Sequence, residues 1–89
     1  MDIIKRGSAG TLESSDAYVE IEPGNGQLDI RLESVVMAQF GDTIRQTVED
    51  MLSEQQVTNA IVRISDRGAL ECVIRARVEA AVLRGRGQN

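Results

Sequence analysis

The sequence predicts a small α/β domain of the α+β type: a two-layer sandwich in the order β-β-α-β-α, with a three-stranded sheet and two helices on one of its faces. Three observations predict it. Two short runs alternate apolar and polar residues, which is typical of half-buried strands, and a third short run does the same. Two longer segments repeat apolar residues at helical spacing. Because every segment is apolar on one side, we expect strands and helices to share one core.

The first half of the chain begins with an irregular segment, followed by two predicted strands. Residues 1–16 contain glycines and paired serines without a sustained period, so we expect a flexible N-terminal arm. Residues 17–22 and 28–33 alternate, and residues 23–27 between them (Pro-Gly-Asn-Gly-Gln) are rich in turn formers. This pattern predicts a β-hairpin.

A long helix follows the predicted hairpin. Ser34 is a suitable N-cap, and the helical pattern runs to about Gln55. Gly41 interrupts good helix formers, and we expect it to mark a close approach of the backbone to a packed neighbour. The apolar stripe expected to face the core consists of Met37, Phe40, Ile44, Val48, Met51 and Leu52.

The second half of the chain predicts one strand and one helix. Residues 60–65 alternate as a third strand, and residues 66–68 (Asp-Arg-Gly) form a turn. A helix is expected from about Ala69 to Arg84. Its main apolar stripe consists of Leu70, Val73, Ile74, Val78, Ala81 and Val82.

Glycines mark the expected end of this helix. Gly85 and Gly87 follow the last periodic residue, as is common after a helix C-terminus. The chain is therefore divided into the arm at 1–16, a single domain at 17–84 and a polar tail at 85–89.

Composition excludes several classes of protein. The 89 residues have a net charge of −4, aromatic residues make up 2%, and Cys72 is the only cysteine. No apolar run approaches the roughly 20 residues of a membrane helix, and the N-terminus has no signal-peptide pattern, so we expect no membrane partner. A lone cysteine excludes an internal disulfide framework and suits the cytoplasm. An acidic chain with few aromatic residues is not expected to bind nucleic acid.

The charge is distributed unevenly along the chain. Residues 1–54 contain eleven acidic and four basic residues, a balance of −7, whereas residues 55–89 contain three acidic and six basic residues, a balance of +3. Such asymmetry suggests a module that docks between larger partners through complementary charge.

No constellation of catalytic residues is apparent. The chain has no histidine, so neither Ser14 nor Ser15 has an imidazole base to activate it. It also lacks a Cys/His cluster for a metal and a glycine loop for phosphate, so we expect no catalytic and no metal residues. Cys72 lies in an apolar helical pattern, which predicts a buried, inert thiol. Arg75 and Arg77 are either a solvated helix face or a site for a phosphate-bearing ligand or an acidic partner.

Three segments resemble the acyl carrier protein, or gamma subunit, of citrate lyase. They are residues 10–16 (Gly-Thr-Leu-Glu-Ser-Ser-Asp), 39–45 (Gln-Phe-Gly-Asp-Thr-Ile-Arg) and 66–80 (Asp-Arg-Gly-Ala-Leu-Glu-Cys-Val-Ile-Arg-Ala-Arg-Val-Glu-Ala). They occur in the family's order and spacing and span nearly the whole chain, and the last is long and unusual in composition. Arg67 stands where lysine is common and Glu71 where aspartate is common, and both keep the charge.

The resemblance implies a covalent prosthetic arm, 2'-(5''-phosphoribosyl)-3'-dephospho-CoA, joined through a phosphodiester to Ser14. Ser15 is adjacent and chemically equivalent, so Ser14 is favoured by its position in the motif alone. Glu13 and Asp16 flank these serines, and their carboxylates would repel the phosphates of the arm. The acyl-bearing thiol would belong to the arm and not to Cys72.

The resemblance also implies partners and a reaction. The carrier would pass acetyl and citryl thioesters between the alpha subunit (an acyl transferase) and the beta subunit (a citryl lyase), while citrate is cleaved to acetate and oxaloacetate. A prosthetic-group transferase would attach the arm. The chain itself would be a non-catalytic subunit.

Two alternatives remain open on the sequence. The first is the carrier of a related acyl enzyme such as malonate decarboxylase, which activity with malonate instead of citrate would reveal. The second is an unmodified adaptor domain, for which Ser14→Ala would be harmless.

Overall fold

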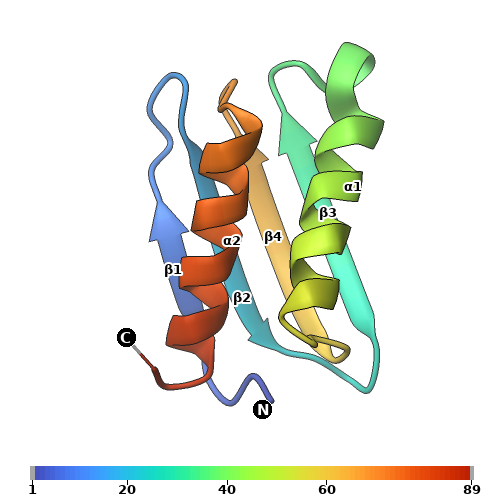
Figure 1. The fold of residues 1–89 in the computed structure, drawn as a ribbon, viewed down its shortest axis with the longest axis vertical. Coiled ribbons are helices and arrows are strands. Elements are labelled where there is room, and N and C mark those ends of the chain that lie inside the picture. Colours follow the sequence, from blue (N-terminus) through green and yellow to red (C-terminus); the bar gives the residue numbers. More distant parts are fainter. Residues whose placement is uncertain (1, 89) are drawn as a thin grey trace.

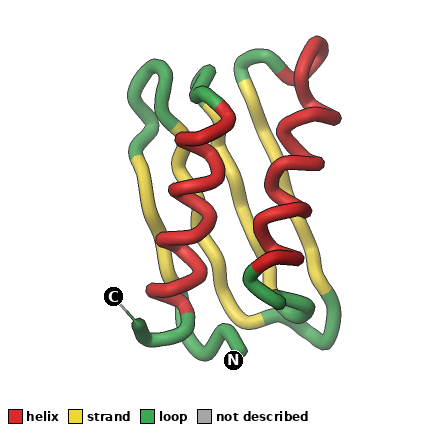
Figure 2. The backbone as a smooth tube through the Cα atoms, viewed as in Figure 1, coloured by secondary structure: helices red, strands yellow, loops and turns green. Residues whose placement is uncertain are grey.

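The computed structural model describes residues 2–88, and it shows one sheet with both helices on the same face (Figure 1, Figure 2). The strand order is β1-β2-β4-β3. The α+β two-layer sandwich is confirmed, but the sheet has four strands and not three. The elements are β1 (Gly7–Gly10), β2 (Ala17–Pro23), β3 (Leu28–Ser34), α1 (Met37–Glu54), β4 (Ala60–Asp66) and α2 (Glu71–Gly85).

The predicted β-hairpin is wrong, because β4 lies between its two strands. β4 pairs antiparallel with β2, placing Ala17 opposite Asp66, and parallel with β3, placing Leu28 opposite Ala60. Turn residues between two strands specify a reversal of direction but not that the strands are neighbours. β4 takes a central position because Ala60, Val62 and Ile64 are all buried on its helix-covered face.

The additional strand, β1, falls in the segment predicted to be a flexible arm. It pairs antiparallel with β2 and lies beneath α2 (Figure 1). A Cβ added at Gly7 would lie 2.5 Å from both the Ala81 carbonyl oxygen and the Gly85 nitrogen, so helix and strand backbones are in close contact. Ile3 is also part of the core. The sequence does not indicate this strand because Gly-Ser-Ala-Gly shows no alternation of apolar and polar side chains. The first residue lies outside the described chain.

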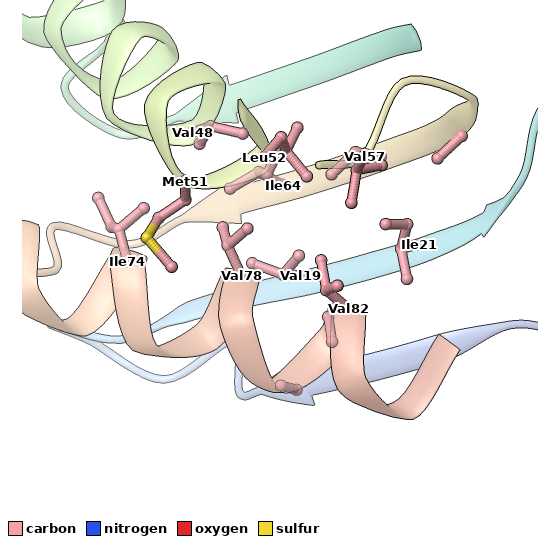
Figure 3. Packing of buried hydrophobic residues seen from close by; sticks show 14 of the residues in the cluster. Val19, Ile21, Val48, Met51, Leu52, Val57, Ile64, Ile74, Val78 and Val82 are labelled. Atoms are coloured by element: carbon pink, nitrogen blue, oxygen red, sulfur yellow. The ribbon is translucent and has the colours of Figure 1, made fainter. Parts of the chain in front are cut away.

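The core between sheet and helices is built mainly from branched aliphatic side chains (Figure 3). α2 covers β1 and β2, while α1 covers β3. Twelve side chains of this core are at most 2% exposed: Ala17, Val19, Ile21, Val48, Leu52, Ala60, Val62, Ile64, Ile74, Val78, Ala81 and Val82.

Helix α1 starts two residues later than predicted, with Val36 and not Ser34 at its N-cap position. Ser34 is the last residue of β3, where its hydroxyl donates to the Asp66 carboxylate (2.7 Å) and accepts from the Val36 N–H (3.0 Å). The first turn of α1 extends beyond the end of the sheet (Figure 1). Met37 and Phe40 are therefore 43% and 51% exposed, and their predicted place in the core stripe is wrong.

Gly41 is buried, as expected of a site of close approach. The neighbour is the side chain of Met37, one turn earlier, whose sulfur would lie 3.0 Å from a Cβ at this position. The absence of a side chain at Gly41 thus lets the Met37 side chain pack against the helix backbone.

Helix α2 also starts later than predicted. Leu70 precedes its first residue and is 71% exposed, because the helix starts at Glu71. Cys72 lies in the first turn and is exposed, so the prediction of a buried thiol is wrong. Both residues lie at the end of the sandwich, where no sheet or helix covers them.

The C-terminal segment begins later than the predicted tail. Gly85 is a buried residue of α2 and its carbonyl accepts from the N–H groups of Ile4 and Lys5. Gly87, with φ of +82°, then ends the helix by a Schellman arrangement, in which the Gln88 N–H donates to the Leu83 carbonyl (2.8 Å). The last residue lies outside the described chain. Across residues 2–88, neither helix has the combination of length and apolar character needed to span a membrane.

Candidate functional site

Ser14 lies at the tip of a turn between β1 and β2, at the end of the sandwich where both helices begin (Figure 1). The turn is closed by the Asp16 N–H, which donates to the Glu13 carbonyl at 3.2 Å. Ser14 is exposed, and within residues 2–88 its hydroxyl makes no hydrogen bond. A large enzyme can therefore approach this oxygen without breaking a contact of the fold.

The turn is fixed to the connection between β4 and α2. The Ser15 N–H donates to the Arg67 carbonyl, and the Arg67 N–H donates to the Asp16 carbonyl, both at 2.9 Å. Ser15 adopts a φ of +67°, a backbone conformation that residues other than glycine rarely adopt. The two adjacent serines thus differ in their backbones, because Ser15 anchors the turn through its N–H at a positive φ. Their side chains are alike: within residues 2–88 both hydroxyls are exposed and make no hydrogen bond. The segment is anchored rather than a flexible arm.

Asp16 is the polar centre of this loop. Its carboxylate accepts from the Arg77 Nε (3.0 Å) and from a second Arg77 nitrogen (3.3 Å), from the Thr11 hydroxyl (2.7 Å) and from the Ala17 N–H (2.7 Å). The hydrogen bonds from Arg77, and then those from Thr11 and Ala17, hold the pKa of Asp16 well below its usual range. The negative charge predicted to repel a phosphate arm is thus offset by the Arg77 guanidinium.

Arg75 and Arg77 do not form one patch. Arg75 pairs with Glu54 of α1 (3.0 Å), whereas Arg77 pairs with Asp16 on the opposite side of α2. Both arginines therefore have carboxylate partners within the fold, and this accounts for them without a ligand.

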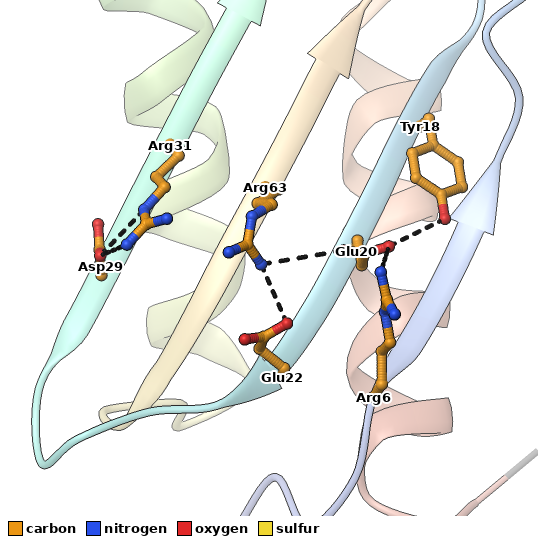
Figure 4. Close-up of polar contacts among 7 residues, drawn as sticks. All are labelled: Arg6, Tyr18, Glu20, Glu22, Asp29, Arg31 and Arg63. Atoms are coloured by element: carbon orange, nitrogen blue, oxygen red, sulfur yellow. Dashed lines mark hydrogen bonds and ion pairs between the residues drawn. The ribbon is translucent and has the colours of Figure 1, made fainter.

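The open face of the sheet carries further charge pairs (Figure 4). Arg63 lies 3.0 Å from Glu22, and Arg6 lies 2.6 Å from Glu20, which also accepts from the Tyr18 hydroxyl. Several pairs join the acidic first half of the chain to the basic second half, so the charge asymmetry of the sequence is partly neutralised within the fold.

Arg67 is a residue of the site that sequence reasoning passed over. Its side chain is exposed and makes no hydrogen bond or ion pair within residues 2–88, while its backbone contacts both Ser15 and Asp16. It is therefore a guanidinium without a carboxylate partner beside the serine turn, suited to a phosphate. The sequence indicates the Asp-Arg-Gly turn that contains Arg67. It does not indicate that this turn lies beside the serine turn, about fifty residues earlier in the chain.

Asp66 joins the connections at this end of the molecule. It is 1% exposed, and its carboxylate accepts from the Ala69 N–H (2.9 Å) and the Ser34 hydroxyl (2.7 Å), while its carbonyl accepts from the Val35 N–H (3.1 Å). These bonds tie the start of α2 to the start of α1. Within residues 2–88, no three His, Cys, Asp or Glu side chains gather in a way that could hold a metal ion.

Comparison with known proteins yields several close relatives. The chain is 55% identical over 85 residues to the citrate lyase acyl carrier protein of Vibrio cholerae, covering 94% of this chain and 87% of the relative. It is 51% identical to the proteins of that name from Cronobacter sakazakii (94% and 87% covered) and Albidiferax ferrireducens (98% and 90% covered). The chain belongs to the citrate lyase acyl carrier protein family.

The carrier family also has a wider relationship. The family model described as "Malonate decarboxylase delta subunit (MdcD)" matches residues 4–85. A chain in a crystal structure of a Pseudomonas malonate decarboxylase hetero-tetramer with malonate superposes with a TM-score of 0.75 over 91% of this carrier and 84% of that chain, at 23% identity. The four-stranded sandwich of this chain is therefore a fold that it shares with a chain of that hetero-tetramer.

Proposed function

We propose that this chain is the acyl carrier subunit of citrate lyase, with the 2'-(5''-phosphoribosyl)-3'-dephospho-CoA arm attached to Ser14. The observation that carries the proposal is the state of Ser14 in a member of this family: an exposed hydroxyl that makes no hydrogen bond within residues 2–88, at the tip of an anchored turn. Ser15 is the weaker candidate because its backbone anchors the turn at a positive φ.

The residues around Ser14 fit an anionic arm. Arg67 offers a cation beside the turn, and Arg77 offsets the carboxylate of Asp16. Of the two flanking acids, only Glu13 has no arginine partner among the residues that the structure describes. When bound, the arm supplies the thiol that carries the acyl group. The residues of this chain bind and position the arm, and we infer no catalytic side chain among them.

The chemistry of carriage accounts for an anchored attachment turn. A fixed point of attachment keeps the thioester at high effective concentration near both active sites, while the arm itself provides the reach. The partners in this proposal are the alpha subunit (acyl transferase), the beta subunit (citryl lyase) and the transferase that attaches the arm, all in the cytoplasm.

Substitution of the two serines tests this function. Ser14→Ala should fold normally, with a free energy of unfolding within about 0.5 kcal/mol of wild type, because an exposed hydroxyl without partners is removed. Incubated with the transferase and the arm precursor, Ser14→Ala should gain no mass and should not support citrate cleavage, whereas Ser15→Ala should be loaded. Loading of Ser14→Ala, or full citrate cleavage with it, would contradict the proposal and favour the unmodified adaptor.

A carrier for malonate decarboxylase is the second candidate, favoured by the matching family model and by the shared fold. The relatives at 51–55% identity favour citrate lyase instead. Reconstitution of the loaded chain with either set of catalytic subunits decides between them: we expect turnover of citrate, and turnover of malonate alone would favour the second candidate.

A further inference from the structure

A groove opens between the first turns of α1 and α2, with a volume of about 330 Å³. We call it the helix-start groove. Buried Ile44 and Ile74 form its base, and Phe40 and Leu70 form its exposed sides. Its principal apolar lining residues are Val36, Phe40, Ile44, Ala69, Leu70 and Ile74.

Exposed apolar side chains gather at this end of the molecule. Single exposed apolar residues are ordinary on protein surfaces, but a cluster of them marks a site of interaction. Of the seven large hydrophobic residues exposed in residues 2–88, two, Ile4 and Leu28, lie elsewhere. The other five surround the helix starts and the serine turn: Leu12, Val35, Met37, Phe40 and Leu70.

The groove is adjacent to the attachment turn. Its lining residues Gly68 and Ala69 directly follow Arg67, whose carbonyl accepts the Ser15 N–H. Because consecutive Cα atoms are about 3.8 Å apart, the groove wall begins within about 8 Å of the Arg67 Cα. A protein that approaches the arm on Ser14 therefore meets the groove as well.

The charge at the groove is acidic. Its lining includes exposed Glu71 and buried Asp66 but no lysine or arginine, and exposed Asp42 lies on the second turn of α1. Arg67, the cation suited to a phosphate, precedes the lining on the side of the serine turn, so the groove itself offers an anionic arm no cation. A basic partner is attracted to the groove.

We propose that the helix-start groove docks an enzyme subunit of the complex through a segment with one or two large apolar side chains flanked by lysine or arginine. This inference rests on the proposed carrier function. It gives a role to Phe40 and Leu70, which the core does not use. The groove is lined by eleven residues, fewer than the roughly 20–30 per partner of a standard stable interface, so we expect the docking to be transient, as a carrier that visits two active sites requires.

Binding measurements without the arm test the docking site. All variants carry Ser14→Ala, so no arm is present, and their affinity for the purified alpha and beta subunits of the host's citrate lyase is measured by calorimetry at low salt. Phe40→Ser with Leu70→Ser should weaken binding to at least one subunit tenfold or more, and 0.3 M salt should weaken the parent. The matched control, Ile4→Ser with Leu28→Ser, should change affinity less than twofold. Leu70→Ala alone, a milder change, should weaken binding in the same direction, and circular dichroism verifies the fold of each variant.

Three results would overturn the inference. If the groove variants bind like the parent, the groove is not the docking site, although the carrier function stands because the parent still binds. NMR contacts between the arm and the groove in the loaded carrier, together with unchanged affinity of the variants, would assign the groove to the arm. Failure of the parent to bind either subunit would overturn both this inference and the proposed function.

Discussion

Ser14 and Asp16 lie two residues apart in one turn and have opposite surroundings. The Ser14 hydroxyl is exposed and unbonded within the described chain, while the Asp16 carboxylate accepts hydrogen bonds from Arg77, Thr11 and Ala17. The resemblance in sequence identified Ser14 as the candidate but gave Asp16 only a repulsive role. The correction depends on Arg77, 61 residues away, and no local pattern indicates such a contact.

The Asp16–Arg77 pair predicts a specific dependence of stability on pH. The folded pKa of Asp16 lies below its unfolded value of about 3.9, so its contribution to stability is present above that value and is lost as the pH falls through the folded pKa. Asp16→Asn lacks this contribution. Urea titrations from pH 7 to pH 2.5 should therefore show wild type more stable than Asp16→Asn above about pH 5, with the difference shrinking as the pH falls.

An exposed side chain that carries no titratable group provides the control for this pH series. Gln39→Ala, on the exposed first turn of α1, removes no ionisable group and should differ from wild type by a nearly constant amount across the same range. A difference between wild type and Asp16→Asn that stays constant or grows toward low pH would contradict the role given to the pair.

Among the elements, β1 differs most from what the sequence indicates. Apolar alternation correctly predicts the strands near residues 17–22, 28–33 and 60–65, and helical periodicity predicts both helices. β1 is missed because Gly7 packs directly against the backbone of α2, and this close contact leaves no apolar side-chain pattern in the sequence. The false hairpin has a similar cause: strand order is a tertiary property, decided by which strand takes the centre of the sheet.

The contact between β1 and α2 predicts the effect of Gly7→Ala. The new methyl group would lie 2.5 Å from two backbone atoms of α2, which cannot move aside like the end of a side chain. We expect a loss of about 1–3 kcal/mol in the free energy of unfolding by urea. Ser8→Ala on the same strand should stay within about 0.5 kcal/mol of wild type. Equal stability of Gly7→Ala and wild type would mean that the segment is not packed against the helix.

At the scale of the whole molecule, the fold brings together two halves of opposite charge. Ion pairs such as Arg75–Glu54 and Arg63–Glu22 join them, and the asymmetry that suggested docking is therefore partly internal. Surface pairs of this kind contribute little to stability, so the aliphatic core must supply most of it. Within residues 2–88, Ser14, the unpaired Arg67 side chain and five of the seven exposed large hydrophobic residues gather at one end.

Two leucines, one in the core and one at the end of the molecule where the helices start, allow the stability contributions of these two regions to be compared. Leu52 is fully buried, and Leu52→Ala should lower the free energy of unfolding by about 2–5 kcal/mol because a cavity remains. Leu70 is 71% exposed, so Leu70→Ala should change it by less than about 0.5 kcal/mol. Urea denaturation of both variants compares them directly. A loss at Leu70 similar to that at Leu52 would show that Leu70 belongs to the core and not to a binding surface.

The carrier role of Ser14 is tested most directly by the intact mass of the protein purified from its native host grown on citrate, followed by peptide mapping. We expect the added mass of one phosphoribosyl-dephospho-CoA arm, located on Ser14 and absent from Ser15. An unmodified mass in cells that are actively cleaving citrate, or an arm on another residue, would contradict the carrier role of Ser14.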